Sequence, residues 1–323
     1  MVARRGARAR YHAGVTGERE EDRQVAKLVG ELGLAPRRIA PLAGDASSRR
    51  FFRVWLEEDC RVVVALYPSG SAAVAAHDAA VQQWAIAHDL PVPRLLAVGP
   101  CGTVSEDLGD EHLEAACTAR GADVVGPLLA TLAAFQRADW HDCPNPPFDE
   151  GFFRRELALF AEFAGLAAHR RVASFLDELA GALARHPYRL VHRDFHLHNL
   201  FWCRGAVVAV DGQDMRAGPD TYDAASLLRE RRGSELVAPL LEPAAIAAAC
   251  GWAPGWEERL LQCGAQRGLK VIGTFLRLAA GGRRGYLRFL PEACRATREA
   301  VAALGAPETL VHRVADLAAA EEV

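Results

Sequence analysis

The feature that most constrains this chain is an island of polar residues enclosed by short apolar runs, in the second half of its 323 residues. Asp194 and Asn199 stand five residues apart, and Asp211 follows twelve residues later, directly after the apolar run 206–210. Runs of this length and composition are typical of short buried strands. The island therefore predicts polar side chains held in loops at strand ends, inside an otherwise helical part of the chain.

The elements predicted around the island divide the chain into two unlike parts. The β-rich runs 51–56 and 61–67 flank the charged turn 57–59 and predict a hairpin. Further strands are predicted at 94–98, 102–106 and 189–191, and helices at 21–35, 71–88, 123–138, 149–166, 171–185, 222–248 and 256–279. We therefore expect an α+β chain with a mobile basic tail (1–21), a small antiparallel-sheet lobe with one helix (22–107) and a large helical lobe (108–323).

Composition argues against several functions. A net charge of −3 gives no broad attraction to nucleic acid or to a membrane surface, and no apolar run approaches the roughly 20 residues that a membrane span needs. The eight cysteines stand singly without a CxxC pair, which argues against a zinc knuckle or a disulfide-stapled scaffold and favours the cytoplasm. Lysine occurs only at Lys27 and Lys270, so roles that lysine usually fills fall to arginine.

The three island residues suit phosphoryl transfer. This reaction needs a carboxylate that orients the attacking hydroxyl and accepts its proton, and we expect Asp194 in that role. It also needs hard oxygen ligands for Mg²⁺, which Asn199 and Asp211 offer. Reading His192 as a packed core histidine and Asp194 as a loop cap leaves the spacing of Asn199 and Asp211 unexplained.

A zinc site is the alternative for the same island, because His192, His196 and His198 also cluster there. Zinc sites need three or four convergent ligands. Since Asp194 and Asn199 already occupy the loop, we favour magnesium, and we expect His198 to pack or to hydrogen-bond inside the loop.

A His-x-Asp triplet with Asn five residues after the Asp, followed by a strand that ends in Asp, is shared by protein kinases and aminoglycoside-phosphotransferase-like kinases. The chain resembles this second superfamily and, within it, the bacterial anomeric kinases of N-acetylmuramate and N-acetylglucosamine that serve cell-wall recycling. The resemblance covers most of the chain and is carried by the segments 44–54, 106–110, 146–160, 192–202, 218–230 and 266–278. It implies a bilobal, protein-kinase-like fold with ATP in the cleft between the lobes, and a small-molecule sugar as the second substrate.

The resemblance also implies where the nucleotide phosphates bind. Ser47 and Ser48 stand in the phosphate-covering turn of the sheet lobe, whose backbone N–H groups can cradle phosphate. Arg49 and Arg50, with Arg53 beyond them, add positive charge at this turn. Exposed hairpin arginines are an equal alternative for each of them.

Two further roles follow from the resemblance. The main chain from Glu106 to Leu108 forms the hinge that pairs with adenine, with a solvated connector as the alternative. Asp223 corresponds to an aspartate that braces the catalytic loop by hydrogen bonds, and we expect it to act structurally rather than in catalysis.

For the sugar, the resemblance implicates charged residues of the helical lobe. Asp194 contacts the reacting hydroxyl, and Glu156 and Asp214 are candidate acceptors for other hydroxyls. Lys270, with Arg277 two turns further, is a candidate partner for a carboxylate such as the lactyl group of muramate. Helix-surface charges are the alternative for Glu156, Lys270 and Arg277.

Two departures from the family pattern stand out. The strand at 62–67 has no lysine where kinases place one against the phosphates, and the helix at 71–88 offers only Asp78 as an acidic partner. Gly212 stands where an aromatic residue usually packs. The loss of such a ring costs about 3–5 kcal/mol in a packed core unless a neighbour fills the space.

Three functions are therefore weighed. The first is an anomeric amino-sugar kinase. The second is another small-molecule kinase, acting on an aminoglycoside, a choline-like alcohol or homoserine, although the arginine-rich segment 283–298 favours a neutral or anionic substrate. The third is an inactive nucleotide-binding module, which the missing strand lysine favours and the intact polar island opposes. The sequence makes no prediction of oligomeric state.

Overall fold

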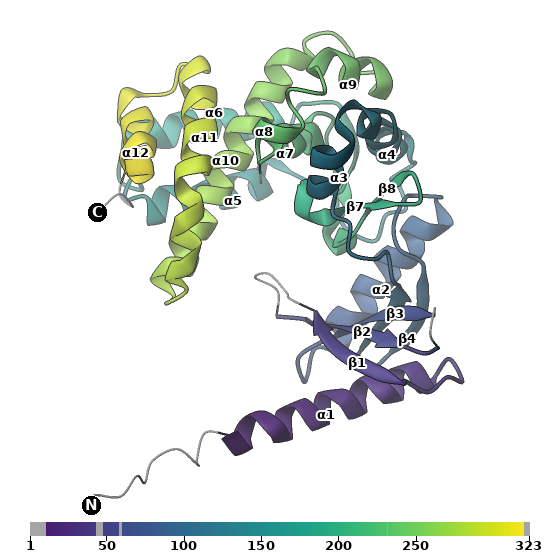
Figure 1. Ribbon diagram of the computed structural model, residues 1–323. Helices are drawn as coiled ribbons and strands as arrows, with labels where there is room; N and C mark the ends of the chain where they lie inside the picture. The colour runs from purple at the N-terminus through teal and green to yellow at the C-terminus, as the bar shows by residue number, and fades with distance from the viewer. Residues whose placement is uncertain (1–10, 43–47, 58–59, 231, 320–323) are drawn as a thin grey trace, which may run out of the picture. The chain divides into compact units, whose positions relative to one another are not determined.

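The computed structural model describes residues 11–42, 48–57, 60–230 and 232–319 (Figure 1). Contacts between Cα atoms divide the chain into two units. The first runs to Gly109 without the segment His88–Pro91, and the second holds that segment and the chain from Asp110 onward. This division falls two residues after the boundary drawn from the sequence.

Within its described residues, the first unit is a five-stranded antiparallel sheet in the order β1-β2-β3-β5-β4. Successive side chains of a strand point to opposite faces. Phe52 and Val54 therefore pack with Val25 and Leu28 of the first helix, whereas Phe51 points to the second helix. The elements are α1 (Tyr11–Gly30), β1 (Arg38–Leu42), β2 (Arg50–Trp55), β3 (Arg61–Leu66), α2 (Ala72–Ala87), β4 (Leu95–Gly99) and β5 (Gly102–Glu106).

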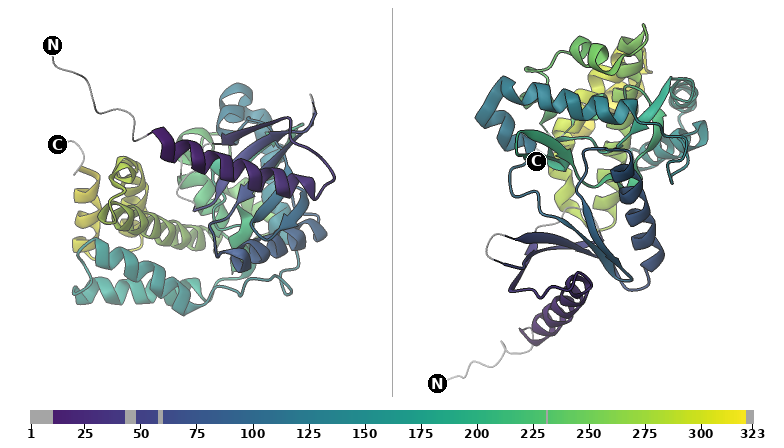
Figure 2. Two further views of the ribbon diagram at one scale, coloured as in Figure 1. Left: turned by 90° about the horizontal axis from the view of Figure 1, so that it is seen from below. Right: turned by 90° about the vertical axis from the view of Figure 1, so that its right-hand side faces the viewer.

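Helix α1 corrects the sequence-based expectation for the start of the chain. It begins at Tyr11, inside the segment expected as a mobile tail, and ends at Gly30 rather than near residue 35. Burial of Val25 and Leu28 fixes the last turns of α1, and the good helix formers at 18–21 precede them. Gly14, Thr16 and Gly17 in the first turns are poor helix formers, so local propensity does not explain the start at Tyr11. Its end is marked by a turn with Gly33 in the left-handed region. Figure 2 shows α1 lying across the sheet. The described residues of this unit hold α1 and α2, which overlap the helices expected at 21–35 and 71–88, whereas the lobe as a whole was expected to have one helix.

The second unit is mostly helical (Figure 1). Its long central helix α10 packs against α5, α7 and α11. Its helices are α3 (Leu113–Arg120), α4 (Val125–Arg137), α5 (Glu150–Phe163), α6 (Arg170–Leu183), α7 (Tyr222–Arg229), α8 (Gly233–Leu236), α9 (Pro243–Cys250), α10 (Trp256–Ala280), α11 (Leu290–Ala303) and α12 (Glu308–Ala319). Its strands are β6 (Tyr188–Val191), β7 (Leu200–Cys203), β8 (Ala206–Ala209) and β9 (Arg216–Pro219), paired as β6–β9 and β7–β8.

The helix expected over 222–248 is wrong, because the chain breaks there into α7, α8 and α9. At the start of α8, a Cβ on Gly233 would lie 1.9 Å from the Leu227 carbonyl oxygen, so the backbone turns too tightly there for a continuous helix. Pro243 then starts α9, because a proline fits the first turn of a helix but not its interior. No helix in the described part of the chain is both long and apolar enough to span a membrane.

Candidate active site

The loop after β6 is held by a buried carboxylate on α7. Asp223 accepts hydrogen bonds from the backbone N–H groups of His192, at 2.6 Å, and Arg193, at 3.0 Å. Arg193 has a φ of 77°, a left-handed conformation that is uncommon for a residue with a side chain. Burial raises the pKa of Asp223, and the His192 ring and the two backbone bonds act against that rise. The bracing bonds predicted for Asp223 are thus present, and they fix the residues just before Asp194.

The β7–β8 hairpin brings the two expected metal ligands to one place. Leu200 pairs with Ala209, so Asn199 and Asp211 both lie at the open end of this hairpin. The backbone N–H of Val210 donates to the carbonyl oxygen of Asn199 at 2.9 Å and ties the two loops together. The spacing read from the sequence therefore corresponds to proximity in the fold.

The donor set at this hairpin end suits magnesium. The Asn199 side-chain nitrogen donates to the backbone carbonyl of Asp194 at 3.0 Å, so its amide oxygen is the atom that it can offer to a metal. Asp211 is exposed and supplies a carboxylate. Amide and carboxylate oxygens, completed by water and phosphate oxygens, are the ligands that Mg²⁺ takes in nucleotide sites.

The histidines considered as zinc ligands make other contacts. The buried His192 ring packs edge-on against Phe135 and Phe195, with centroids 5.6 and 6.0 Å away. His198 lies with its Nε2 atom 3.5 Å from a Glu114 carboxylate oxygen. Across the described ranges, no group of three or more His, Cys, Asp or Glu side chains is placed to hold a metal ion.

Two cations on α10 approach the Asp194 carboxylate. Arg267 Nη2 lies 3.4 Å from its Oδ1 atom, and Lys270 Nζ lies 3.6 Å from the same atom. Burial would raise the pKa of Asp194, but Lys270, Arg267, His196 and Arg193 together hold it below its usual range. Asp194 is therefore ionised at neutral pH.

Arg267 also ties the catalytic loop to the helical core. Its buried guanidinium donates to the backbone carbonyl of Arg193 and makes a two-point ion pair with Glu230, one contact of which is 3.0 Å long. It lies over the Tyr222 ring, 4.6 Å from the centroid. A guanidinium satisfies several acceptors at once because it carries five donors in a fixed plane.

The two candidate hydroxyl acceptors for the sugar flank a single guanidinium. Glu156 accepts from Arg193 Nη2 at 3.1 Å and, through its other oxygen, from Gln266 Nε2 at 2.7 Å. Asp214 Oδ1 lies 3.2 Å from Arg193 Nη1. Both carboxylates are thus bound within the protein, and Arg193, which follows His192 in the catalytic loop, links them.

Met215 fills the space beside Gly212. A Cβ on Gly212 would lie 2.6 Å from Met215 Cε and 3.4 Å from His192 Nε2. Met215 is fully buried, and its flexible thioether is suited to irregular gaps. Met215 is therefore the neighbour that occupies space beside Gly212, where the aromatic ring is missing.

The expected phosphate turn is described only in part, because Ser47 lies outside the described residues. Arg49 forms an ion pair with Asp78 of α2, with Nη1 and Oδ2 3.5 Å apart. Arg50 instead pairs with Glu21 of α1. Two arginines that are adjacent in sequence thus turn to opposite faces of the sheet, and Ser48 precedes both.

The hinge segment is braced from the sheet. Arg53 Nη2 donates to Asp107 Oδ1 at 3.0 Å and to the backbone oxygen of Gly109 at 2.9 Å. The Glu106 carboxylate accepts from the backbone N–H and the Nε of Arg94 at 2.9 and 3.0 Å. Arg53 therefore has a bracing role in this segment rather than the place at the phosphate turn that was suggested for it.

Residues 38–261, more than half of the chain, match the profile of the phosphotransferase enzyme family, APH. The chain belongs to the phosphotransferase enzyme family. Its members transfer a phosphoryl group, so the chemistry predicted from the polar island agrees with the family.

Two relatives in this family share most of their length with the chain. The N-acetylmuramate/N-acetylglucosamine kinase of Pseudomonas aeruginosa is 32% identical over 308 residues, which cover 86% of this chain and 87% of the relative. The enzyme of the same name from Neisseria meningitidis is 31% identical over 278 residues, which cover 77% and 80%. These matches confirm the resemblance inferred from the sequence segments.

The fold is also shared with a solved structure. A choline/ethanolamine kinase family protein from Mesorhizobium loti superposes with a TM-score of 0.60 at 16% identity, covering 93% of this chain and 98% of that protein. At this identity the likeness concerns the fold alone. It confirms the predicted α+β, protein-kinase-like fold.

One buried cation of the site, Arg267, was not predicted from the sequence. Arg267 lies in the segment 266–278 that supported the family resemblance, yet only Lys270 and Arg277 were singled out there. The available signal was the spacing of Arg267 and Lys270, since side chains three apart share one face of a helix. The partner Glu230 is 37 residues away in sequence, so no local pattern indicates it.

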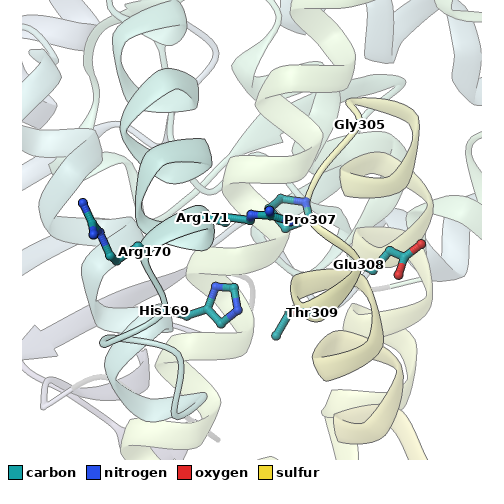
Figure 3. Close-up of a pocket in the computed structure, with 7 residues that line it drawn as sticks. All are labelled: His169, Arg170, Arg171, Gly305, Pro307, Glu308 and Thr309. Atoms are coloured by element: carbon teal, nitrogen blue, oxygen red, sulfur yellow. The ribbon is translucent and has the colours of Figure 1, made fainter.

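A hollow of about 570 Å³ lies elsewhere in the second unit, between the starts of α6 and α12. Figure 3 shows His169 and Thr309 facing the space between these two helix ends, whereas Arg170 points away from it. Its other lining residues are Arg171, Gly305, Pro307 and Glu308. None of these seven residues belongs to the candidate site described above.

Proposed function

We propose that this protein is an ATP- and Mg²⁺-dependent kinase of the anomeric hydroxyl of N-acetylmuramate or N-acetylglucosamine. The observation that carries the chemistry is the Asp194 loop, braced by Asp223 and joined to Asn199 and Asp211 at one hairpin end. The acceptor is proposed from the two relatives named as kinases of these sugars, which match 86% and 77% of the chain. We place the reaction in the cytoplasm, consistent with eight free thiols.

Asp194 is proposed to orient the sugar hydroxyl and to accept its proton as the O–P bond forms and the bond to the ADP oxygen breaks. The transition state of phosphoryl transfer is loose, so little basicity is needed. An anomeric hydroxyl is more acidic than an ordinary alcohol, and it therefore suits a base whose pKa is lowered by Arg267 and Lys270. Arg267 is a positioning residue here, because its contacts with Arg193 and Asp194 set the direction of the carboxylate.

Asn199 and Asp211 are proposed to hold Mg²⁺ through their side-chain oxygens. When bound, this ion neutralises negative charge on the phosphates. Ser47 and Ser48 are proposed to offer backbone N–H groups to the phosphates, with Arg49 and Arg50 as nearby cations. The main chain of the hinge, from Glu106 to Leu108, is proposed to pair with adenine.

The sugar is proposed to contact the Arg193-linked carboxylates. Glu156 and Asp214 each retain acceptor capacity, since a carboxylate oxygen accepts more than one hydrogen bond. Lys270 lies close enough to Asp194 to contact a substrate whose hydroxyl binds that base. A carboxylate-bearing sugar would gain most from Lys270, so we expect the preference between the two sugars to respond to Lys270→Ala.

The test is a panel of acceptors offered with Mg-ATP to the purified protein: N-acetylmuramate, N-acetylglucosamine, glucosamine and kanamycin. ADP release above the acceptor-free rate is expected with the two N-acetylated sugars, and with neither in Asp194→Asn. Release with kanamycin alone would move the protein to antibiotic modification. Nucleotide binding without release for any acceptor would favour an inactive nucleotide-binding module.

A further inference from the structure

Beyond Arg61 at its first position, whose Nε lies 3.4 Å from Asp107 Oδ2, strand β3 presents no cation on the face of the sheet that is turned to α2. Val63, Ala65 and Tyr67 alternate onto this face, and Ala65 and Tyr67 pack with Ala75 of α2. In protein kinases a β3 lysine binds the nucleotide phosphates and is held by a glutamate of the neighbouring helix. A working kinase with this strand must supply that charge from another position.

Arg49 lies on this same face. The pairing of Phe51 with Ala65 continues to Arg50 opposite Leu66, which brings Arg49 to the level of Tyr67. The Arg49 guanidinium lies 5.4 Å from the Phe51 ring centroid and 5.9 Å from that of Tyr67. It is thus a neighbouring-strand cation placed beside β3, over two aromatic rings.

A carboxylate on α2 anchors this cation. Asp78, the single acidic residue within α2, lies with Oδ2 3.5 Å from Arg49 Nη1 and accepts a 2.8 Å hydrogen bond from the Tyr67 hydroxyl. Burial and the hydrogen bond to Asp78 raise the pKa of Tyr67 to about 12, so its hydroxyl stays a donor at neutral pH. The side chains of Arg49 and Asp78 are only 14% and 12% exposed, which makes the pair well shielded from water.

Arg50 cannot join Arg49 and Asp78, because successive side chains of β2 point to opposite faces of the sheet. Its guanidinium pairs with Glu21 and lies 5.6 Å from the Phe52 ring centroid, on the face covered by α1. The two arginines therefore provide a matched pair of variants. They are adjacent in sequence and carry the same charge, yet they lie on opposite sides of one sheet.

We infer that Arg49, held by Asp78 and Tyr67, replaces the missing β3 lysine as the cation that binds the nucleotide phosphates. A guanidinium has five donors, so it can keep an ion pair with Asp78 and still donate to phosphate oxygens. Asp78 takes the place of the helix glutamate and acts as a positioning residue. The inference rests on the proposed use of ATP, but not on the identity of the sugar.

The experiment is a titration of the full-length protein with Mg·AMP-PNP by calorimetry, without any sugar. We expect Arg49→Ala to weaken binding about 10- to 100-fold, as loss of charge-assisted bonds does. Arg49→Lys restores part of the affinity because it keeps the charge. Asp78→Asn weakens binding less than Arg49→Ala, because the guanidinium stays but is no longer fixed. Arg50→Ala tests whether the adjacent arginine binds the phosphates instead. Arg38→Ala is the control for net charge, because it removes an exposed arginine that is stacked on Trp55.

Several outcomes would overturn the inference. Unchanged affinity in a folded Arg49→Ala protein would do so, as would a larger loss in Arg50→Ala than in Arg49→Ala. Circular dichroism checks folding; if Arg49→Ala is unfolded, Arg49→Lys and Asp78→Asn decide, and full affinity in both would contradict the inference. If the wild-type protein binds nucleotide but phosphorylates no sugar, the proposed acceptor fails while the role of Arg49 stands. With an active sugar, Arg49→Ala should raise KM for ATP and leave KM for the sugar nearly unchanged.

Discussion

The Asp194 carboxylate lies close to several cations, and these determine its pKa. Burial alone would raise its pKa, but the nearby Lys270 and Arg267 lower it below the usual range. A carboxyl group whose folded pKa is lowered stabilises the fold above its unfolded pKa, about 3.9, and loses that contribution as the pH falls toward the folded pKa. The ionised state is therefore both the stabilising state and the state proposed for catalysis.

The lowered pKa of Asp194 gives a prediction for how the free energy of unfolding depends on pH. The free energy of unfolding of the wild-type protein should exceed that of Asp194→Asn at neutral pH, and the difference should shrink below about pH 4. Urea titrations of both proteins across this range measure it. A difference that widens on acidification would contradict the proposed environment of Asp194.

Arg267 gives a second prediction at the scale of one side chain. Arg267→Met should lower the free energy of unfolding by about 3–5 kcal/mol, because it leaves the Glu230 carboxylate without its buried partner. Arg267→Lys should recover only part, since an ammonium group cannot reach Glu230, Asp194 and the Arg193 carbonyl together. Urea unfolding measures both variants. The stability control is Arg277→Ala, on an exposed position of the same helix; equal losses in both would mean that the buried network contributes little.

Residues of this site differ in how far the sequence could predict them. Asp194, Asn199 and Asp211 were predicted because their spacing is local and their residue types have few alternative explanations. The roles proposed for Arg267 and Arg49 depend on contacts with Glu230 and Asp78, which are distant in sequence and are set by packing. Such pairings have no period or motif, so only the fold reveals them.

Among the elements, the β7–β8 hairpin places the loops of the two proposed metal ligands, and it was predicted only in part. The apolar run 206–210 was recognised as a strand, whereas β7 lies so close to the catalytic motif that it was not separated from the loop. Strand β9 ends in Gly218 and Pro219, residues typical of turns, and its partner β6 lies far away in sequence. Short strands like these are decided by their partners more than by their own composition.

The turn after this hairpin gives a prediction for packing. Gly212→Phe should destabilise the protein by about 1–3 kcal/mol, because Met215 already fills the space that the ring would enter. Met215→Ala alone should cost about 2–5 kcal/mol through the cavity that it leaves. Combining the two changes should recover part of the loss, as measured by thermal or urea unfolding. If the two losses of unfolding free energy were strictly additive in the double variant, Met215 would not occupy the space that a ring at position 212 enters.

For the whole molecule, the change from strand-forming to helix-forming sequence predicted the α+β class, and the sequence segments predicted the family. The sequence did not predict the helix boundaries that depend on tertiary contacts. Helix α1 starts at Tyr11 rather than at residue 21, and the chain from 222 to 248 breaks where its backbone packs closely at Gly233. Local propensity predicts neither of these boundaries.

Anomeric phosphorylation by this protein is tested by a ³¹P–¹H correlation spectrum of the product formed from N-acetylmuramate and Mg-ATP. We expect a phosphorus signal coupled to the anomeric proton of the sugar, present with the wild-type protein and absent with Asp194→Asn. A phosphorus signal coupled to the proton of another sugar carbon would contradict the anomeric assignment. A product formed equally well by Asp194→Asn would contradict the role of Asp194 as the base.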